Sequence, residues 1–281
     1  MTRYVLVTIA VPEEQFDLAS AVFSTYPLVG VEERMDELTI CFEQNDFHDG
    51  MEQSILDELL ALNIQARLIK VGTEEDQNWN AEWEKSIDPV VVNDRIVIVP
   101  EWKASDYASV PLRLVITPKM SFGTGHHATT RMMCLLTEEY VCPGDFWVDV
   151  GTGTGVLAIL AVKLGARQAW GFDNSEWSVV NARENIAQND VVDHVTVEES
   201  GLEDVQLPAC DGLMANLYRH LVIPYAAAFV RAVKPGGIIL VSGILKYDID
   251  EVCAPFLELG CFAEKTLQES EWAAVAFRTP Q

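Results

Sequence analysis

The stretch VDVGTGTGVLA (residues 148–158) places glycines at 151, 153 and 155 between a strand-like apolar run and a helix-like apolar run. Glycines at such a junction let the backbone turn tightly and let a ligand approach the main chain. This arrangement is typical of nucleotide-binding α/β folds, in which the ligand lies at the carboxyl edge of a parallel sheet. The stretch therefore predicts a cofactor site at this turn, with Gly151 and Gly153 in contact with the cofactor.

The segments around this loop alternate between strand-like and helix-like patterns. We expect strands at residues 146–150, 168–173, 194–200, 211–217 and 236–243, and helices at residues 128–141, 156–166, 175–189, 218–233 and 248–260. Such alternation implies right-handed crossovers and a parallel sheet. Two adjoining strands, 261–270 and 271–280, end the chain and add an antiparallel edge strand. The expected fold is thus Rossmann-like, with a mostly parallel seven-stranded sheet.

The residues before this region predict a separate, small α+β domain. Strands are expected at residues 3–11, 29–35, 37–43 and 64–72, and helices at residues 12–26 and 46–62. The order β-α-β-β-α-β is the ferredoxin-like arrangement. This domain, residues 1–72, contains no nucleophile–base pair and no metal-ligand cluster. We therefore expect the chemistry to lie in residues 89–281.

A polar, helix-prone segment at residues 73–88 separates the two domains. Trp79 and Trp83 are four residues apart, which places them on one face of a helix. We interpret the segment as a linker helix whose tryptophans pack between the domains. The alternative is that the two tryptophans form a docking surface for a partner.

The chain is strongly acidic, with 43 acidic against 19 basic residues and a formal net charge of −24. This balance argues against direct binding of nucleic acid, which requires a basic patch. It favours a cationic partner such as a lysine-rich protein, although acidity can also serve solubility alone.

Other features of the composition concern location and assembly. No apolar run reaches the roughly 20 residues of a membrane span. The apolar run near the N-terminus is interrupted by acids and a proline and predicts a strand, not a signal peptide. The six cysteines form no CxxC pair, which indicates neither a disulfide framework nor a zinc site. The sequence shows no exposed apolar stripe that would indicate a dimer interface. We therefore expect a monomer, located in the cytoplasm.

Two cofactors compete for the glycine loop. A dinucleotide would use a GxGxxG pattern, and GxGxxA can be matched to residues 153–158. However, the carboxylate of Asp149, two residues before Gly151, would repel a pyrophosphate and would attract the ammonium group of an amino acid. Asp173, at the end of the next strand, is placed to bind ribose hydroxyls. S-adenosylmethionine (SAM) carries both groups, so the pattern favours SAM over NAD.

Two further segments flank the predicted site. Asn216, in MANL (214–217), ends the fourth strand of the sheet, where its amide oxygen can accept a hydrogen bond from an incoming amine. Another glycine-rich loop, SFGTGHHATT (121–130), precedes residues 148–158 along the chain; it is called the first glycine loop below, and residues 151–155 form the second. Adjacent histidines rarely share a face, so we expect His126 and His127 to bind no metal, and His127 to order the first glycine loop.

Taken together, these motifs resemble the PrmA family, the methyltransferases of large-subunit ribosomal protein L-eleven. The resemblance covers nearly the whole chain and rests on NWNAEWEK, FGTGHHATT, DVGTGTGVLAI, GFD, MANL and SGIL. FGTGxHxTT followed at this distance by DxGxGxG is far more specific than either loop alone. The chain departs from the family in GTGTG, where GCGSG is common, and in ANLYRHL, where ANILAxPL is common.

The resemblance implies a class I SAM-dependent methyltransferase fold behind the ferredoxin-like domain. It implies that Thr130, Gly151, Asp173 and Asn216 contact SAM, and that the two glycine loops lie on opposite sides of it, the first loop closing after SAM enters. It also implies that the acceptors are lysine side chains and the N-terminal amine of a ribosomal protein. The N-terminal domain of this chain, residues 1–72, would bind that ribosomal protein.

Asn216 is then the expected catalytic residue, because it would hold the neutral amine in line with the methyl group. No dedicated general base is evident, and the proton would be lost to water. Three alternatives remain: a methyltransferase for another protein or small amine, a SAM-binding module without catalysis, and, more distantly, a dehydrogenase.

Overall fold

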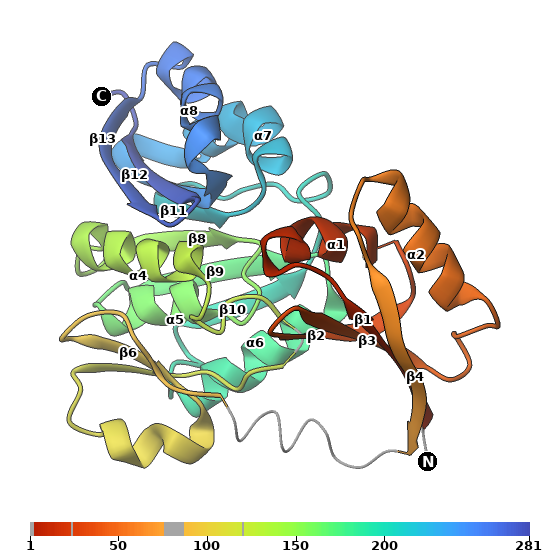
Figure 1. Ribbon diagram of the computed structural model, residues 1–281. Helices are drawn as coiled ribbons and strands as arrows, with labels where there is room; N and C mark the ends of the chain where they lie inside the picture. Colours follow the sequence, from red (N-terminus) through yellow and green to blue (C-terminus); the bar gives the residue numbers. More distant parts are fainter. Residues whose placement is uncertain (1–2, 24, 76–86, 120) are drawn as a thin grey trace. The chain divides into compact units, whose positions relative to one another are not determined.

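The computed structural model describes residues 3–23, 25–75, 87–119 and 121–281 of the chain (Figure 1). The chain divides into two compact units, Met1–Ser86 and Ile87–Gln281. Among the described residues, the first unit has a hydrophobic core of its own, which includes Val7, Ile40 and Leu59. Most of the expected linker helix, with Trp79 and Trp83, lies outside the described residues.

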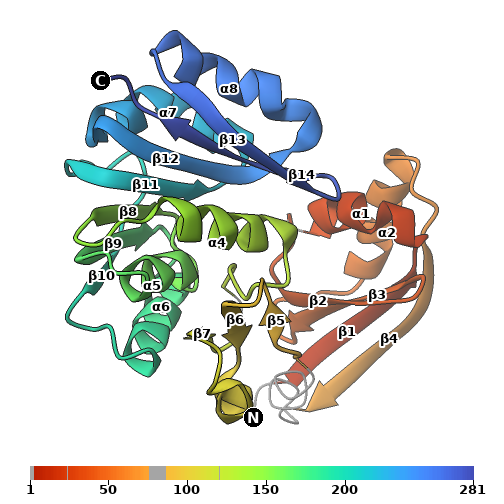
Figure 2. The ribbon, with the colours of Figure 1, turned by 90° about the vertical axis from the view of Figure 1, so that its left-hand side faces the viewer.

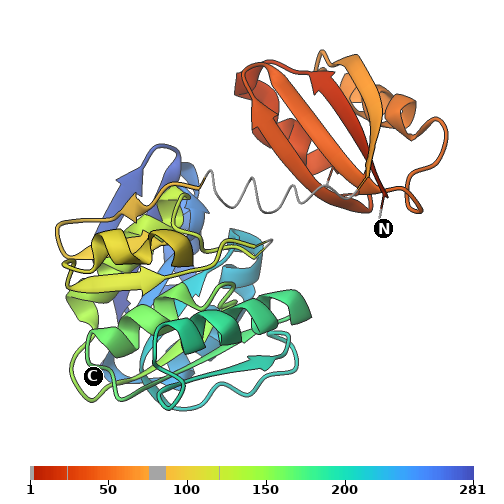
Figure 3. The same cartoon turned by 90° about the horizontal axis from the view of Figure 1, so that it is seen from below.

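The first unit has the expected ferredoxin-like order. It consists of β1 (Arg3–Ala10), η1 (Glu13–Gln15), α1 (Phe16–Phe23), β2 (Leu28–Arg34), β3 (Glu37–Glu43), α2 (Met51–Ala61) and β4 (Arg67–Glu75). The sheet order is β2-β3-β1-β4, and every neighbouring pair is antiparallel. The side chains of Val5, Val7 and Ile9 alternate inward along β1, so one face of the sheet is covered by both helices (Figure 3). β4 continues to Glu75, past the expected domain end at residue 72.

The second unit is built on a seven-stranded sheet. Its strands are β8 (Phe146–Val150), β9 (Gln168–Asp173), β10 (Val195–Glu199), β11 (Cys210–Asn216), β12 (Val233–Leu245), β13 (Phe262–Glu269) and β14 (Trp272–Arg278). The order is β10-β9-β8-β11-β12-β14-β13. β8 to β12 are parallel to one another, and β14 is antiparallel to both of its neighbours. The mostly parallel sheet with a closing hairpin is confirmed; the antiparallel strand lies one place inside the edge (Figure 2).

Helices cover both faces of this sheet. They are α4 (Ala128–Tyr140), α5 (Val156–Lys163), α6 (Glu176–Gln188), α7 (Arg219–Ala232) and α8 (Ile249–Glu258). Trp147 packs into the core that contains α4, α5 and α6, whereas Val148 packs into the core that contains α7 and α8. Successive residues of a strand face opposite sides, so the apolar run at the start of β8 supplies both layers.

A small three-stranded sheet contributes side chains to the core that contains α4, α5 and α6. β5 (Val90–Val91), β6 (Ile96–Val99) and β7 (Leu112–Val115) pair in that order, with η2 (Glu101–Tyr107) between β6 and β7. β7 packs against α5, the helix that begins directly after the glycine loop. The six cysteines form no disulfide bond. None of the helices in the described part of the chain combines the length and hydropathy that a membrane crossing requires.

Candidate functional site

Three of the expected site residues lie side by side at one edge of the sheet. β8 is parallel to β9 and to β11, so the three strands end in the same direction. Val150 is paired with Phe172 on one side and with Ala215 on the other. The next residues, Gly151, Asp173 and Asn216, are therefore level. With neighbouring strands about 4.8 Å apart, the backbones of Asp173 and Asn216 stand roughly 10 Å apart across Gly151.

Two glycines of the loop after β8 have conformations that a side chain would not tolerate. Gly151 has a φ of 67°, and an added Cβ would stand 2.6 Å from a methyl carbon of Leu217, the residue after Asn216. Gly153 has a φ of 53°, and an added Cβ would stand 2.3 Å from the carbonyl oxygen of Phe122. The loop needs glycine at both positions because it is packed against two neighbouring segments.

Asp173 already supports the loop from the neighbouring strand. One carboxylate oxygen accepts a hydrogen bond from the backbone N–H of Gly153 at 3.0 Å, and the other accepts from Ser175 at 3.0 Å. A carboxylate has about four acceptor positions, so two remain for hydroxyl groups of a ligand. This geometry suits the expected ribose contact, which remains a prediction.

Asp149 faces the interior, with 1% of its surface exposed. Its carboxylate accepts a hydrogen bond from the Thr152 hydroxyl at 2.7 Å. Burial raises the pKa of Asp149 to about 6, opposed by the hydrogen bonds from Thr152 and from the backbone of Ala158. Asp149 therefore stabilises the glycine loop through its hydrogen bond with Thr152, a role that the sequence did not indicate.

The expected role of His127 is confirmed. Its ring caps α4, with Nδ1 2.7 Å from the Thr129 hydroxyl and accepting from the backbone N–H of Thr129. The ring also packs on Trp272 of β14, with 4.6 Å between the ring centres. Arg131 holds the same stretch, because it donates to the carbonyl oxygens of Gly125 and His126 and pairs with Glu269 of β13. Closure of this loop as a whole would have to break these contacts.

The two glycine loops touch directly. The backbone N–H of Thr154 donates to the carbonyl oxygen of Phe122 at 2.9 Å. The Thr154 hydroxyl donates to the carbonyl oxygen of Gly123, also at 2.9 Å. The loops are thus fastened to each other at residues 122–123 and 153–154, and only their remaining parts can face a ligand from two sides.

Two buried polar atoms near this edge have no hydrogen-bond partner among the described residues. They are the hydroxyl oxygen of Thr130, in the first turn of α4, and the amide oxygen of Asn216. A buried polar group without a partner costs about 1–3 kcal/mol. Each atom is therefore suited to a ligand that supplies the missing hydrogen bond.

The residues after Asn216 form the solvent-facing side of this edge. Tyr218 is 64% exposed and stacks on His220, with 5.8 Å between the ring centres. Arg219, between them, is held by Asp248 and Glu251 at 3.0 and 2.7 Å. The segment ANLYRHL, which departs from the common family sequence, thus places exposed aromatic side chains beside Asn216.

His126 and His127 belong to no metal-ligand cluster in the described ranges, where no group of three His, Cys, Asp or Glu side chains could hold a metal ion.

Comparison with known proteins decides the family. The model of the family described as ribosomal protein L11 methyltransferase (PrmA) matches residues 7–280. The chain belongs to this family. The match includes both units, so the sequence resemblance is confirmed over almost the whole chain.

Individual PrmA relatives agree. The ribosomal protein L11 methyltransferase of Chlorobaculum parvum is 34% identical over 272 residues, which are 92% of this chain and 93% of the relative. The protein of that name from Listeria monocytogenes serotype 4a is 34% identical over 206 residues, which are 73% of this chain. The matched segment spans 66% of the Listeria protein, just under two thirds of its length.

The fold also matches a solved structure. The crystal structure of the ribosomal protein L11 methylase from Lactobacillus delbrueckii subsp. bulgaricus is similar with a TM-score of 0.62 and 26% identity. The similarity covers 69% of this chain and 100% of that one. The class I methyltransferase fold expected from the PrmA motifs is therefore confirmed.

Sequence reasoning missed several residues that build this PrmA site. Thr154 fastens the two loops, Leu217 packs over Gly151, and Asn185 of α6 donates to the carbonyl oxygen of Thr154 at 2.9 Å. One signal was available: asparagines at 181, 185 and 189 recur every four residues, which places them on one face of α6.

Proposed function

We propose that this protein transfers methyl groups from SAM to lysine side chains or the N-terminal amine of ribosomal protein L11. The observation that carries the proposal is the level row of Gly151, Asp173 and Asn216 at the carboxyl edge of a PrmA-family sheet. Thr130 and Asn216 add two buried oxygens without a hydrogen-bond partner in the described chain.

The donor set fits SAM. Asp173 has acceptor capacity left for two ribose hydroxyls, and the glycines bring the backbone of residues 151–153 close to a ligand. The Thr130 hydroxyl and the Asn216 amide supply polar contacts that the protein itself leaves open. When bound, SAM supplies a methyl group that is already electrophilic because it is carried on a sulfonium.

The protein's own task is to position the acceptor amine. A lysine amine has a reference pKa of about 10.4, so it must lose a proton before its lone pair can attack. The amide oxygen of Asn216 can accept a hydrogen bond from the neutral amine and so aim the lone pair at the methyl group. The proton passes to water, and positioning accounts for most of the rate acceleration.

We propose that the first unit binds the ribosomal protein. The described residues of this unit include no cluster that could hold a metal ion, and the chain's charge of −24 suits a lysine-rich partner while disfavouring direct contact with nucleic acid. We propose that the protein acts as a monomer in the cytoplasm, where its substrate is made.

Transfer of label from methyl-labelled SAM to a panel of purified ribosomal proteins tests the proposal. A single labelled band at L11 is expected. Label on a different protein, or only on small amines, would mean that the substrate is not L11. Binding of SAM without any transfer would mean that the protein is a non-catalytic SAM-binding module.

Asp173→Ala is expected to raise the Kd for SAM about 10- to 100-fold, because hydrogen bonds to a charged group contribute roughly 1.5–3 kcal/mol. The variant also leaves the backbone N–H groups of Gly153 and Ser175 without their acceptor, so thermal stability should fall as well. Isothermal titration with SAM measures the effect, and Ser200→Ala at the end of the neighbouring strand is a matched control. An unchanged Kd would refute the ribose assignment.

Asp149→Asn is expected to stabilise the ligand-free protein above pH 6 and to weaken SAM binding. The folded-state pKa of about 6 lies above the ordinary 3.8, so the protonated acid contributes stability that is lost as the pH rises through 6. The variant avoids this loss, worth about 3 kcal/mol at 1.36 kcal/mol per pKa unit. Thermal unfolding from pH 4 to 8 should show its advantage growing up to pH 6–7. A constant difference across this range would contradict the buried, titrating carboxyl.

A further inference from the structure

Asparagines in α6 and at its C-terminal cap fix the segment that leads from β7 into the first glycine loop. Asn189, 4% exposed, accepts from the backbone N–H of Val115 at 3.0 Å and donates to its carbonyl oxygen at 2.6 Å. One turn earlier, the fully buried Asn185 accepts from the backbone N–H of Thr117 at 2.9 Å. The amides thus pair with the extended chain much as a neighbouring strand would.

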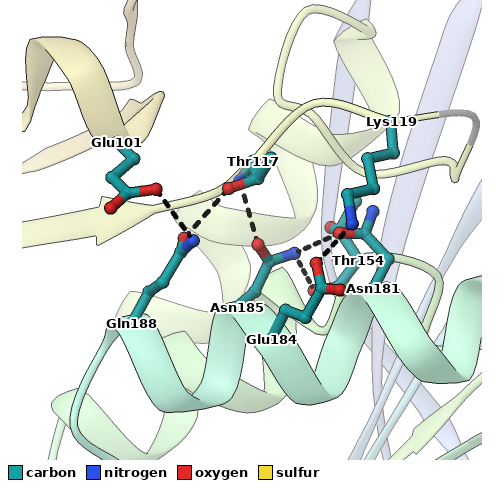
Figure 4. A network of polar contacts seen from close by, with 8 residues as sticks. All are labelled: Glu101, Thr117, Lys119, Thr154, Asn181, Glu184, Asn185 and Gln188. Atoms are coloured by element: carbon teal, nitrogen blue, oxygen red, sulfur yellow. Dashed lines mark hydrogen bonds and ion pairs between the residues drawn. The ribbon is translucent and has the colours of Figure 1, made fainter.

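In contrast to Asn189, Asn185 also contacts the second glycine loop. Its amide nitrogen donates to the carbonyl oxygen of Thr154 at 2.9 Å, and Asn181 accepts from the same nitrogen at 3.4 Å. Figure 4 shows Asn185 between Thr117 on one side and Thr154 on the other. One buried side chain therefore contacts the segment before the first glycine loop and the middle of the second.

Thr154 completes a closed ring of contacts. Its backbone N–H and its hydroxyl both hold the first loop, at the carbonyl oxygens of Phe122 and Gly123. The chain from Thr117 to Gly123 is thus fastened at its start by Asn185 and at its end by Thr154. The contacts farther along α6, from Gln188 to Thr117 and to Glu101, join this ring from a more exposed position.

We propose that Asn185 is a positioning residue for the cofactor site, which acts through Thr117 and Thr154 to keep the two glycine loops at the separation that binds SAM. The proposal rests on the SAM-binding function proposed above. Asn185 touches no predicted SAM-contacting side chain, so its effect is indirect. These hydrogen bonds hold both loops in one arrangement, so a cofactor binds without first having to order them.

The test compares Asn185→Ala with Asn189→Ala in the full-length protein. Both side chains are buried, Asn185 within α6 and Asn189 at its C-terminal cap, and Asn189 makes hydrogen bonds to Val115 and to the backbone of Asn185 but none to either glycine loop. A purely structural role predicts that the two variants lose thermal stability and SAM affinity together. A positioning role predicts that only the Asn185 variant loses SAM affinity.

We expect the Kd for SAM, measured by isothermal titration, to rise about 10-fold in Asn185→Ala and to stay within about 2-fold of wild type in Asn189→Ala. The KM for SAM should follow the Kd, with kcat at saturating SAM changed far less. Hydrogen exchange at the Thr154 amide should accelerate only in Asn185→Ala. Equal changes in the Kd for the two variants would overturn the proposal.

Thr154→Val decides the question if Asn185→Ala does not fold. This change keeps the shape of the side chain and removes only the hydroxyl bond to Gly123. A Kd for SAM several-fold above that of the wild type supports the proposal, and an unchanged Kd overturns it. Failure of the wild-type protein to bind SAM would instead refute the proposed function.

Discussion

Asn216→Ala is expected to lower kcat for methyl transfer on the order of 100-fold, because small losses of alignment between reacting atoms have effects of this size. The variant also loses a polar contact to SAM, so the Kd for SAM should rise several-fold. Single-turnover transfer to L11, measured beside SAM titrations, separates the two effects. Ser242→Ala at the neighbouring position of β12 is a control, since the Ser242 hydroxyl is already bound to the carbonyl oxygen of Ala273 at 2.8 Å.

Asn216→Asp makes the same test directional. The carboxylate adds a negative charge near the sulfonium, so SAM affinity should be equal or better. The same charge raises the pKa of the acceptor amine, which then needs a higher pH to become neutral. We expect a reduced kcat and a pH optimum shifted upward. Wild-type kcat with an unshifted optimum would mean that another residue holds the amine.

Removal of residues 1–86 is expected to leave a folded unit that binds SAM with nearly wild-type affinity. The two cores on either face of the main sheet contain only residues from Ile96 onward. The value of kcat/KM for L11 should fall on the order of 100-fold or more, because binding energy from a remote part of the substrate is lost. Kinetics on intact L11, with SAM titration as the folding control, measure both. Near-normal activity would place substrate recognition in the second unit.

Most of the fold could be predicted because its signals are local. The inward alternation in β1 and the apolar runs of β8 and β11 define their strands without knowledge of their partners. The ends of elements were less predictable. β4 extends to Glu75 through pairing with Arg3, and an interaction across that distance leaves no mark in the segment itself.

The candidate site could be predicted only in part. Gly151, Asp173 and Asn216 each follow a strand, so a parallel sheet alone brings them together. The attraction of Asp149 for the cofactor's ammonium group stays a prediction; its burial under the loop and its bond to Thr152 were not foreseen. The contact between the two glycine loops could not be foreseen, because it depends on how the chain after β7 lies against α6.

The intact mass of purified L11 after incubation with this protein and SAM is the most direct test of the proposed methyl transfer. We expect the mass to increase by whole methyl groups, mapped by peptide analysis to lysine side chains or the N-terminal amine, and to increase hardly at all with Asn216→Ala. An unchanged L11 mass, under conditions where the wild-type protein binds SAM, would contradict it.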